Sequence, residues 1–88
     1  MKVMVQEVEG EGLPSLLGKN IEVWTGVYIY AGLLIGVNNT CIKLDNCHVV
    51  YETGNLDAKS YKDAQKMPMV HYIQTNNIIS FGETSKLK

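Results

Sequence analysis

The fold is decided by residues 27–37, which read VYIYAGLLIGV and carry no charged side chain. β-Branched and aromatic residues are frequent in this stretch and in the residues before it, so we expect a β-strand. A strand that is apolar on both faces has to be covered on both sides or curl around a core. Gly32 and Gly36 lie on one face of it, with Leu34 between them. Glycines at this spacing allow the sharp bend that small barrels require.

Four further strands are expected around this one. The first is residues 21–24, the third follows the polar turn 38–40, and residues 70–74 and 78–81 form the last two around the turn 75–77. The third strand changes its inward face halfway, because the alternation that starts at Ile42 is one residue out of phase with that of Cys47, Val49 and Tyr51. A bulge near Asp45-Asn46 would turn both sets inward.

The segments outside these strands are short and mostly polar. Residues 1–12 form an N-terminal arm whose first eight residues alternate as a short strand or extended segment, and residues 13–18 read as one helical turn with Pro14 at its start and Gly18 at its end. Residues 53–68 form a polar insertion, in which Asn55 could cap a short helix over about 56–66. Residues 83–88 form a polar tail.

These elements predict an all-β fold with a single domain over residues 1–88. We expect a small, strongly bent, five-stranded antiparallel barrel, preceded by a short N-terminal helix, with the polar insertion between the third and fourth strands. A chain of 88 residues is large enough for one hydrophobic core, since folding at this size buries about 64% of its surface.

The charge balance limits the kinds of partner. Eight lysines and no arginine face nine carboxylates, and the net charge is −1. Phosphate neutralisation supplies most of the affinity of typical nucleic-acid binders, so a strongly electrostatic binder is excluded. Binding of unpaired bases through stacking and hydrogen bonds is still compatible with this composition.

The order of the segments resembles the Sm-like (LSm) family over residues 13–52 and 69–82. Residues 16–23 (LLGKNIEV) look like the family's entry into its first strand, and residues 30–34 (YAGLL) resemble the glycine–any–leucine centre of its first motif. Residues 44–49 (LDNCHV) look like the tail of that motif, and residues 71–81 (HYIQTNNIISF) resemble the second motif. Another SH3-like or OB-type barrel is the alternative.

The resemblance implies assembly into a homo-oligomeric ring. The residues themselves favour the same conclusion, because the last two strands of a five-stranded bent sheet are apolar edges that no Pro or Lys protects. Pairing the fourth strand of one copy with the fifth of the next satisfies both edges. The predicted interface residues are Val70, Tyr72, Ile73, Ile78, Ile79 and Phe81.

The resemblance also implies binding of single-stranded, often uridine-rich, RNA at the pore. Family members use an Asp that orders the first loop, a stacking residue, an Asn that binds the base edge, and an Arg-Gly pair in the second loop. In this sequence the first loop is residues 37–41, which contain Asn38 at the Asp position and no aromatic residue. Gln74-Thr75 stands where the second loop would have Arg-Gly. Lys43 and His71 lie near these loops in sequence. The predicted RNA contacts are Asn38, Asn39, Gln74 and Asn76.

Two alternatives to RNA binding follow from the same residues. The asparagines of both loops could instead be turn-forming residues with no ligand. The missing arginine and the negative net charge favour a ring-forming scaffold without nucleic acid, which would act through the insertion or the N-terminal arm. The insertion itself is either a solvated face or a partner surface.

Other chemistry finds little support in the sequence. Cys41, Cys47, His48 and His71 lack the spacing of a zinc site, and Cys47 and His48 are adjacent, so in a strand they point to opposite faces. We therefore expect no enzyme activity, no metal and no small-molecule cofactor. No apolar run is long enough to span a membrane, and two cysteines suit a reducing compartment, so we expect a cytoplasmic protein.

Overall fold

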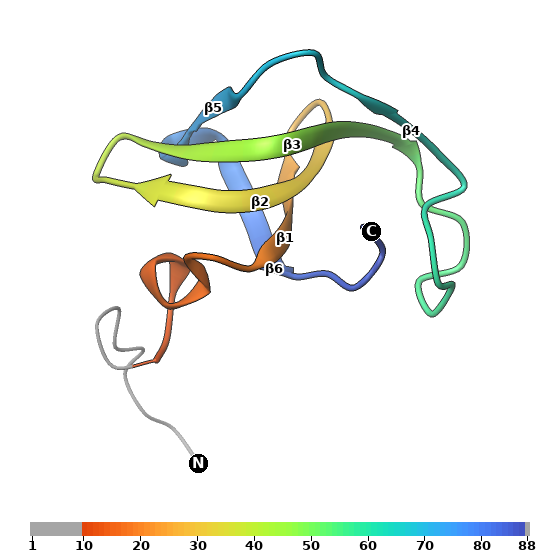
Figure 1. Ribbon diagram of the computed structural model, residues 1–88, viewed down its shortest axis with the longest axis horizontal. Helices are drawn as coiled ribbons and strands as arrows, with labels where there is room; N and C mark the ends of the chain where they lie inside the picture. The colour runs from red at the N-terminus through yellow and green to blue at the C-terminus, as the bar shows by residue number, and fades with distance from the viewer. Residues whose placement is uncertain (1–9, 88) are drawn as a thin grey trace.

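The computed structural model describes residues 10–87, and the alternating segment predicted for residues 1–8 lies outside them. The chain forms one antiparallel sheet of six strands with no α-helix in the described range (Figure 1). Its elements are η1 Leu13–Leu16, β1 Asn20–Thr25, β2 Ile29–Val37, β3 Cys41–Glu52, β4 Asp63–Lys66, β5 His71–Gln74, η2 Thr75–Asn77 and β6 Ile78–Glu83. The prediction of an all-β antiparallel fold is confirmed, with six strands in place of five.

The strand order is β4-β3-β2-β1-β6, and β5 pairs with β3 as well. The long strand β3 thus pairs with β5 through residues 41–44 and with β4 through residues 48–52. β6 pairs with β1 at the other end of the sheet. The sheet bends strongly, since β2 and β3 run across Figure 1 while β1 and β6 run steeply to them. It is not closed, because β5 and β6 do not pair with each other.

The bulge predicted in the middle of β3 is present. The register with β2 shifts between the pairs Ala31↔His48 and Leu33↔Asp45, and Asn46 has a φ of 51°. Both Leu44 and Cys47 are fully buried as a result. Gly32 lies against the bulge, where a Cβ atom would come within 2.9 Å of the Asp45 carbonyl oxygen. The glycine therefore makes room for the bulged backbone of β3.

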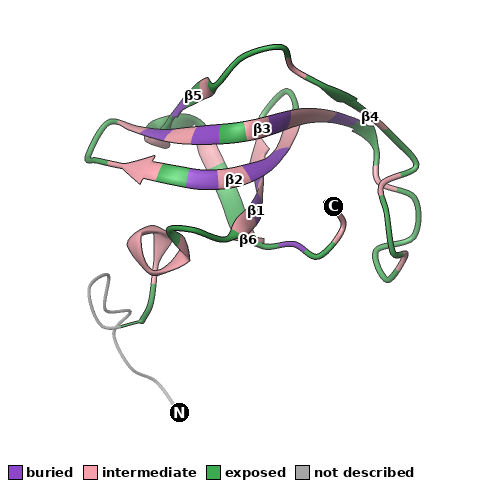
Figure 2. Ribbon diagram, in the orientation of Figure 1, coloured by how far each residue is buried: buried purple, intermediate pink, exposed green. Residues whose placement is uncertain are grey.

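Most buried residues lie on β1, β2 and β3 (Figure 2). The buried cluster of the core consists of Ile21, Val23, Leu34, Ile42, Leu44, Cys47 and Ile73. One part of the predicted pattern is wrong: after Cys47 the next residue buried on β3 is Val50, whereas Tyr51 is exposed. β3 has a second irregularity at this point, between Val50 and Glu52 in its register with β4, so simple alternation from Cys47 fails.

The insertion contains no helix in the structure, so the helix predicted over about 56–66 is wrong. Its last residues form β4, which pairs with the C-terminal half of β3. The extended β3 leaves an open edge there, and pairing along it satisfies more backbone groups than a short helix with a weak apolar stripe.

Side chains attach the insertion to the opposite end of the sheet. The Tyr61 hydroxyl lies 2.9 Å from Glu22 Oε1 and 3.1 Å from Thr84 Oγ1, and Trp24 Nε1 donates to Glu22 Oε2 over 2.8 Å. Burial raises the pKa of Tyr61 to about 12, and Lys86 lies over its ring. The insertion is therefore fastened to β1 and to the residues after β6 by a polar network.

The helical turn predicted over residues 13–18 is present as the 3₁₀ helix η1, with Pro14 in its first turn and Gly18 following at a φ of 84°. Leu13 and Leu16 pack against the core. No helix of residues 10–87 has the length and apolar character needed to cross a membrane.

Stability is expected to fall as the pH rises from about 9 to 11, because burial raises the pKa of the Cys47 thiol from 9.0 to about 11. In this window the unfolded chain loses the thiol proton first, so the folded state holds more protons and rising pH favours unfolding. Urea denaturation at several pH values measures the slope, which Cys47→Ala should reduce. An unchanged slope in Cys47→Ala would contradict the assignment.

Candidate nucleic-acid interface

Two polar loops that are far apart in the sequence lie together in the structure. The β2–β3 turn, residues 38–40, meets η2 through two hydrogen bonds. The backbone N–H of Thr75 donates to the Thr40 carbonyl oxygen over 2.9 Å, and its hydroxyl donates to the Asn39 carbonyl oxygen over 3.1 Å. The loops singled out from the sequence therefore form one continuous surface.

Asn38 organises the first loop. Its Oδ1 accepts hydrogen bonds from the Thr40 backbone N–H at 2.8 Å, the Thr40 hydroxyl at 2.9 Å and the Cys41 backbone N–H at 2.9 Å. This is the turn chemistry expected of asparagine, and it uses the carbonyl oxygen fully. Asn38, predicted as an RNA contact, is therefore a turn-forming residue.

The other three predicted RNA contacts line one hollow. It has a volume of about 610 Å³ and is lined by Asn39, Thr40, Cys41, Tyr72, Gln74, Thr75 and Asn76. Asn39, Gln74 and Asn76 are exposed, and their side-chain amides make no hydrogen bond to another residue of the described chain. Each amide offers two donors and an acceptor to a ligand. We call this hollow the amide hollow.

Tyr72 is the residue of the amide hollow that sequence reasoning missed, because it was assigned to the subunit contact. Its side chain is 58% exposed, and Lys43 Nζ lies 5.6 Å from its ring centroid. Strand alternation could have predicted that Tyr72 lies beside Gln74, since the two are two residues apart and point to the same face of β5. The hollow thus contains an aromatic plane that the first loop does not supply.

The predicted interface residues divide into two groups. Val70, Tyr72, Ile79 and Phe81 are exposed, with Ile79 at 74%. Ile73 is only 6% exposed within the core, and Ile78 packs against that core. The side chains of Ile73 and Ile78 therefore pack within one copy, unlike those of the other four predicted interface residues.

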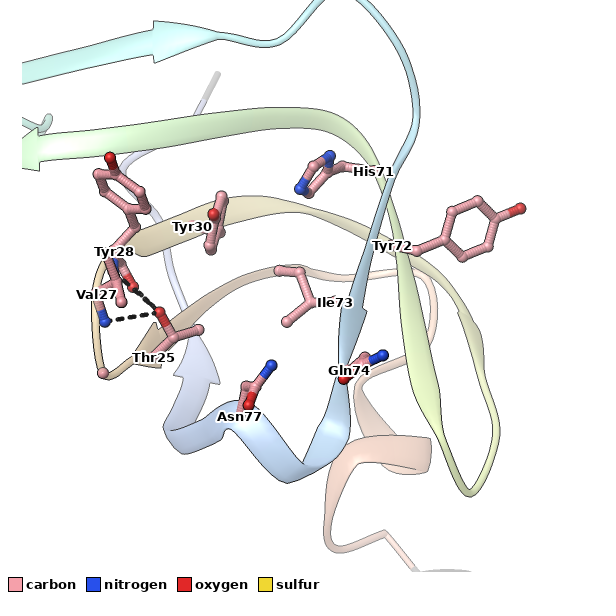
Figure 3. Close-up of a pocket in the computed structure, with 10 residues that line it drawn as sticks. Thr25, Val27, Tyr28, Tyr30, His71, Tyr72, Ile73, Gln74 and Asn77 are labelled. Carbon is pink, nitrogen blue, oxygen red and sulfur yellow. Dashed lines mark hydrogen bonds between the residues drawn. The ribbon is translucent and has the colours of Figure 1, made fainter.

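A second hollow lies between the β1–β2 turn and β5, and most of its lining residues are labelled in Figure 3. Its volume is about 510 Å³. The rings of Tyr30 and His71 stack with their centroids 5.4 Å apart, and Tyr28 meets Tyr30 edge-on at 6.2 Å. His71 is thus a packing residue, and it points away from the amide hollow onto the opposite face of β5.

The remaining candidate ligand residues do not form a cluster. Within residues 10–87, no three His, Cys, Asp or Glu side chains are placed to share a metal ion. Cys41 lines the amide hollow and is partly exposed, whereas Cys47 is fully buried. The chemistry available at the interface is therefore hydrogen bonding and stacking.

No protein-family model matches the sequence, and no curated protein matches it. The function is therefore inferred from the open strands, the amide hollow and the charges around it.

Proposed function

We propose that this chain is an Sm-like subunit that assembles head to tail into a homo-oligomeric ring and binds single-stranded RNA at the loops around its pore. The observation that carries the proposal is that, among residues 10–87, β5 and β6 each pair on one side only and are joined by a three-residue turn. On the β3 side the sheet ends in β4 and β5, which pair with different halves of β3, and on the β1 side it ends in β6.

Open strands favour association with a second copy. Apolar side chains accompany both of them, namely Val70 and Tyr72 on the β5 side and Ile79 and Phe81 on β6. Neither strand contains a Pro or Lys, which are common protections of strand edges. Pairing β5 of one copy with β6 of the next uses different surfaces of identical subunits, so it forms a closed ring if the rotation between copies permits.

Ring assembly repeats the amide hollow once per subunit. Gln74 and Asn76 offer donors and acceptors that match the polar edge of an unpaired base, and each hydrogen bond contributes about 0.5–1.5 kcal/mol. Without an arginine the hollow has no bidentate phosphate fork. We therefore propose weak binding per subunit, strengthened by repetition around the ring.

The first test is an anisotropy titration of a labelled oligouridine of about twelve nucleotides at two salt concentrations. We expect saturable binding and about a tenfold weaker affinity in Gln74→Ala, which corresponds to the loss of two hydrogen bonds to a base. Gln65→Ala is the matched control, because Gln65 is an exposed amide on β4 that does not line the amide hollow. RNA should also slow the alkylation of Cys41.

Two results would contradict RNA binding in the amide hollow: equal affinities of Gln74→Ala and the parent protein, or unchanged alkylation of Cys41 at saturating RNA. If the parent binds no RNA at low salt but assembles, the scaffold function becomes the better proposal. The net charge of −1 and the absence of arginine favour that second candidate.

A further inference from the structure

Tyr72 lies in the middle of a strip on the outer face of β3 and β5. Ile42 pairs with Ile73, and this buried pair faces the core. The neighbouring pairs, Cys41↔Gln74 and Lys43↔Tyr72, point to the opposite face because strand side chains alternate. The outer face therefore presents an amide, an aromatic ring and an ammonium group side by side.

Tyr72 lines the hollow of Figure 3 and two further hollows, and these two lie along the strip. One is the amide hollow. The other, which we call the lysine hollow, has a volume of about 560 Å³, and its lining includes Lys43, Asp45, Lys66 and Tyr72. Along the strip, the surface thus changes from neutral amides near η2 to lysine side chains near the end of β4.

The two lysines of the lysine hollow, near the end of β4, are available for an anion. Lys43 lies over Tyr72, and neither Lys43 nor Lys66 forms an ion pair with another described residue. By contrast, Lys62 Nζ lies 3.0 Å from Glu52 Oε2. Asp45 is the one carboxylate lining the hollow, and its Oδ1 accepts the Asn46 backbone N–H. Two positive charges therefore face one negative charge in a chain whose net charge is negative.

We infer that this strip is a track for single-stranded RNA that continues from the amide hollow, with a base stacked on Tyr72 and phosphates beside Lys43 and Lys66. The inference rests on the proposed RNA function and names further contacts for it. An exposed aromatic ring offers a stacking plane to any base, and lysines in the adjoining hollow can contact the phosphates of the nucleic-acid backbone. Tyr72 would supply the stacking plane that the β2–β3 turn lacks.

The test compares variants along the strip, using the same labelled oligouridine. We expect Tyr72→Ala to weaken binding about tenfold, with Tyr72→Phe close to the parent, because phenylalanine keeps the stacking plane. Lys66→Gln is expected to reduce the slope of log affinity against log salt by about 0.7, the value for one phosphate on a single strand. The control Lys59→Gln removes an exposed lysine of the insertion outside the strip and should leave that slope unchanged.

Each outcome separates the track from the amide hollow. If Gln74→Ala weakens binding while Tyr72→Ala and Lys66→Gln bind like the parent, RNA binds at the hollow and the track is overturned. If the parent binds no RNA, the proposed function and the track both fail. Light scattering on each variant detects altered assembly. If Tyr72→Ala changes the oligomer, the salt dependence of Lys66→Gln is the deciding measurement, because Lys66 lies outside β5 and β6.

Discussion

Gly32→Ala is expected to lower the free energy of unfolding by about 2–3 kcal/mol, the upper range for overpacking a well-filled core. A Cβ atom at Gly32 would lie 2.9 Å from the Asp45 carbonyl oxygen, 3.1 Å from Cys47 Cα and 3.2 Å from Leu44 Cβ. Two of these atoms belong to the backbone of the β3 bulge, so no rotamer change relieves the contact. For a domain of this size, the melting temperature should fall by about 10–20 °C.

Gly26→Ala is the matched control for this prediction. No atom lies within 4 Å of a Cβ built at Gly26, and its φ is not in the left-handed region. Its free energy of unfolding should stay within about 0.5 kcal/mol of the parent value. Urea denaturation followed by circular dichroism measures both variants. Equal stabilities of Gly32→Ala and Gly26→Ala would show that the bulge does not depend on the missing side chain.

Ile79→Lys is expected to abolish assembly while leaving the fold of the subunit intact. Ile79 lies on the open strand β6 and is 74% exposed, so the substitution adds a charge to the proposed contact without removing core volume. A lysine on an edge strand opposes pairing with another strand, because its charge would be desolvated in the contact. Light scattering or sedimentation should show an oligomer for the parent and a monomer for the variant.

Leu56→Lys controls for adding the same charge at an apolar residue that is 75% exposed in the insertion, away from β5 and β6. It should assemble like the parent, and both variants should keep the circular dichroism spectrum of the sheet. A parent protein that is monomeric at micromolar concentration would contradict the ring, as would an Ile79→Lys variant that still assembles.

The strand segments and the bend of β2 were predictable because they depend on local residue pattern. Gly32 and Gly36 predicted a bend in the second strand, and the phase change around Asp45-Asn46 predicted the bulge that Asn46 forms. β4 was not predictable, since residues 63–66 have little strand character of their own. They pair because β3 extends past its bulge and presents an open edge.

The candidate site was only partly predictable for a similar reason. Asn39 and Asn76 were identified by their place in two polar turns, and Gln74 because the resemblance implies an arginine at its position; all three line one hollow. The sequence did not distinguish the roles of Asn38 and Asn39. Only the structure shows that the side-chain oxygen of Asn38 accepts hydrogen bonds within its own turn. Ile73 and Ile78 were assigned to the interface because apolar residues on an edge strand belong either to the core or to a contact, and periodicity does not separate the two.

By itself, the sequence determined an all-β chain with a bulge at Asn46, amide-rich turns and no excess of positive charge. These properties follow from backbone preferences and composition, which are local. Only the tertiary structure decided that β5 pairs with β3 while β6 pairs with β1, and that the two polar turns meet through Thr75. Those contacts depend on how a bent sheet brings distant strands together, and this geometry is a property of the whole chain.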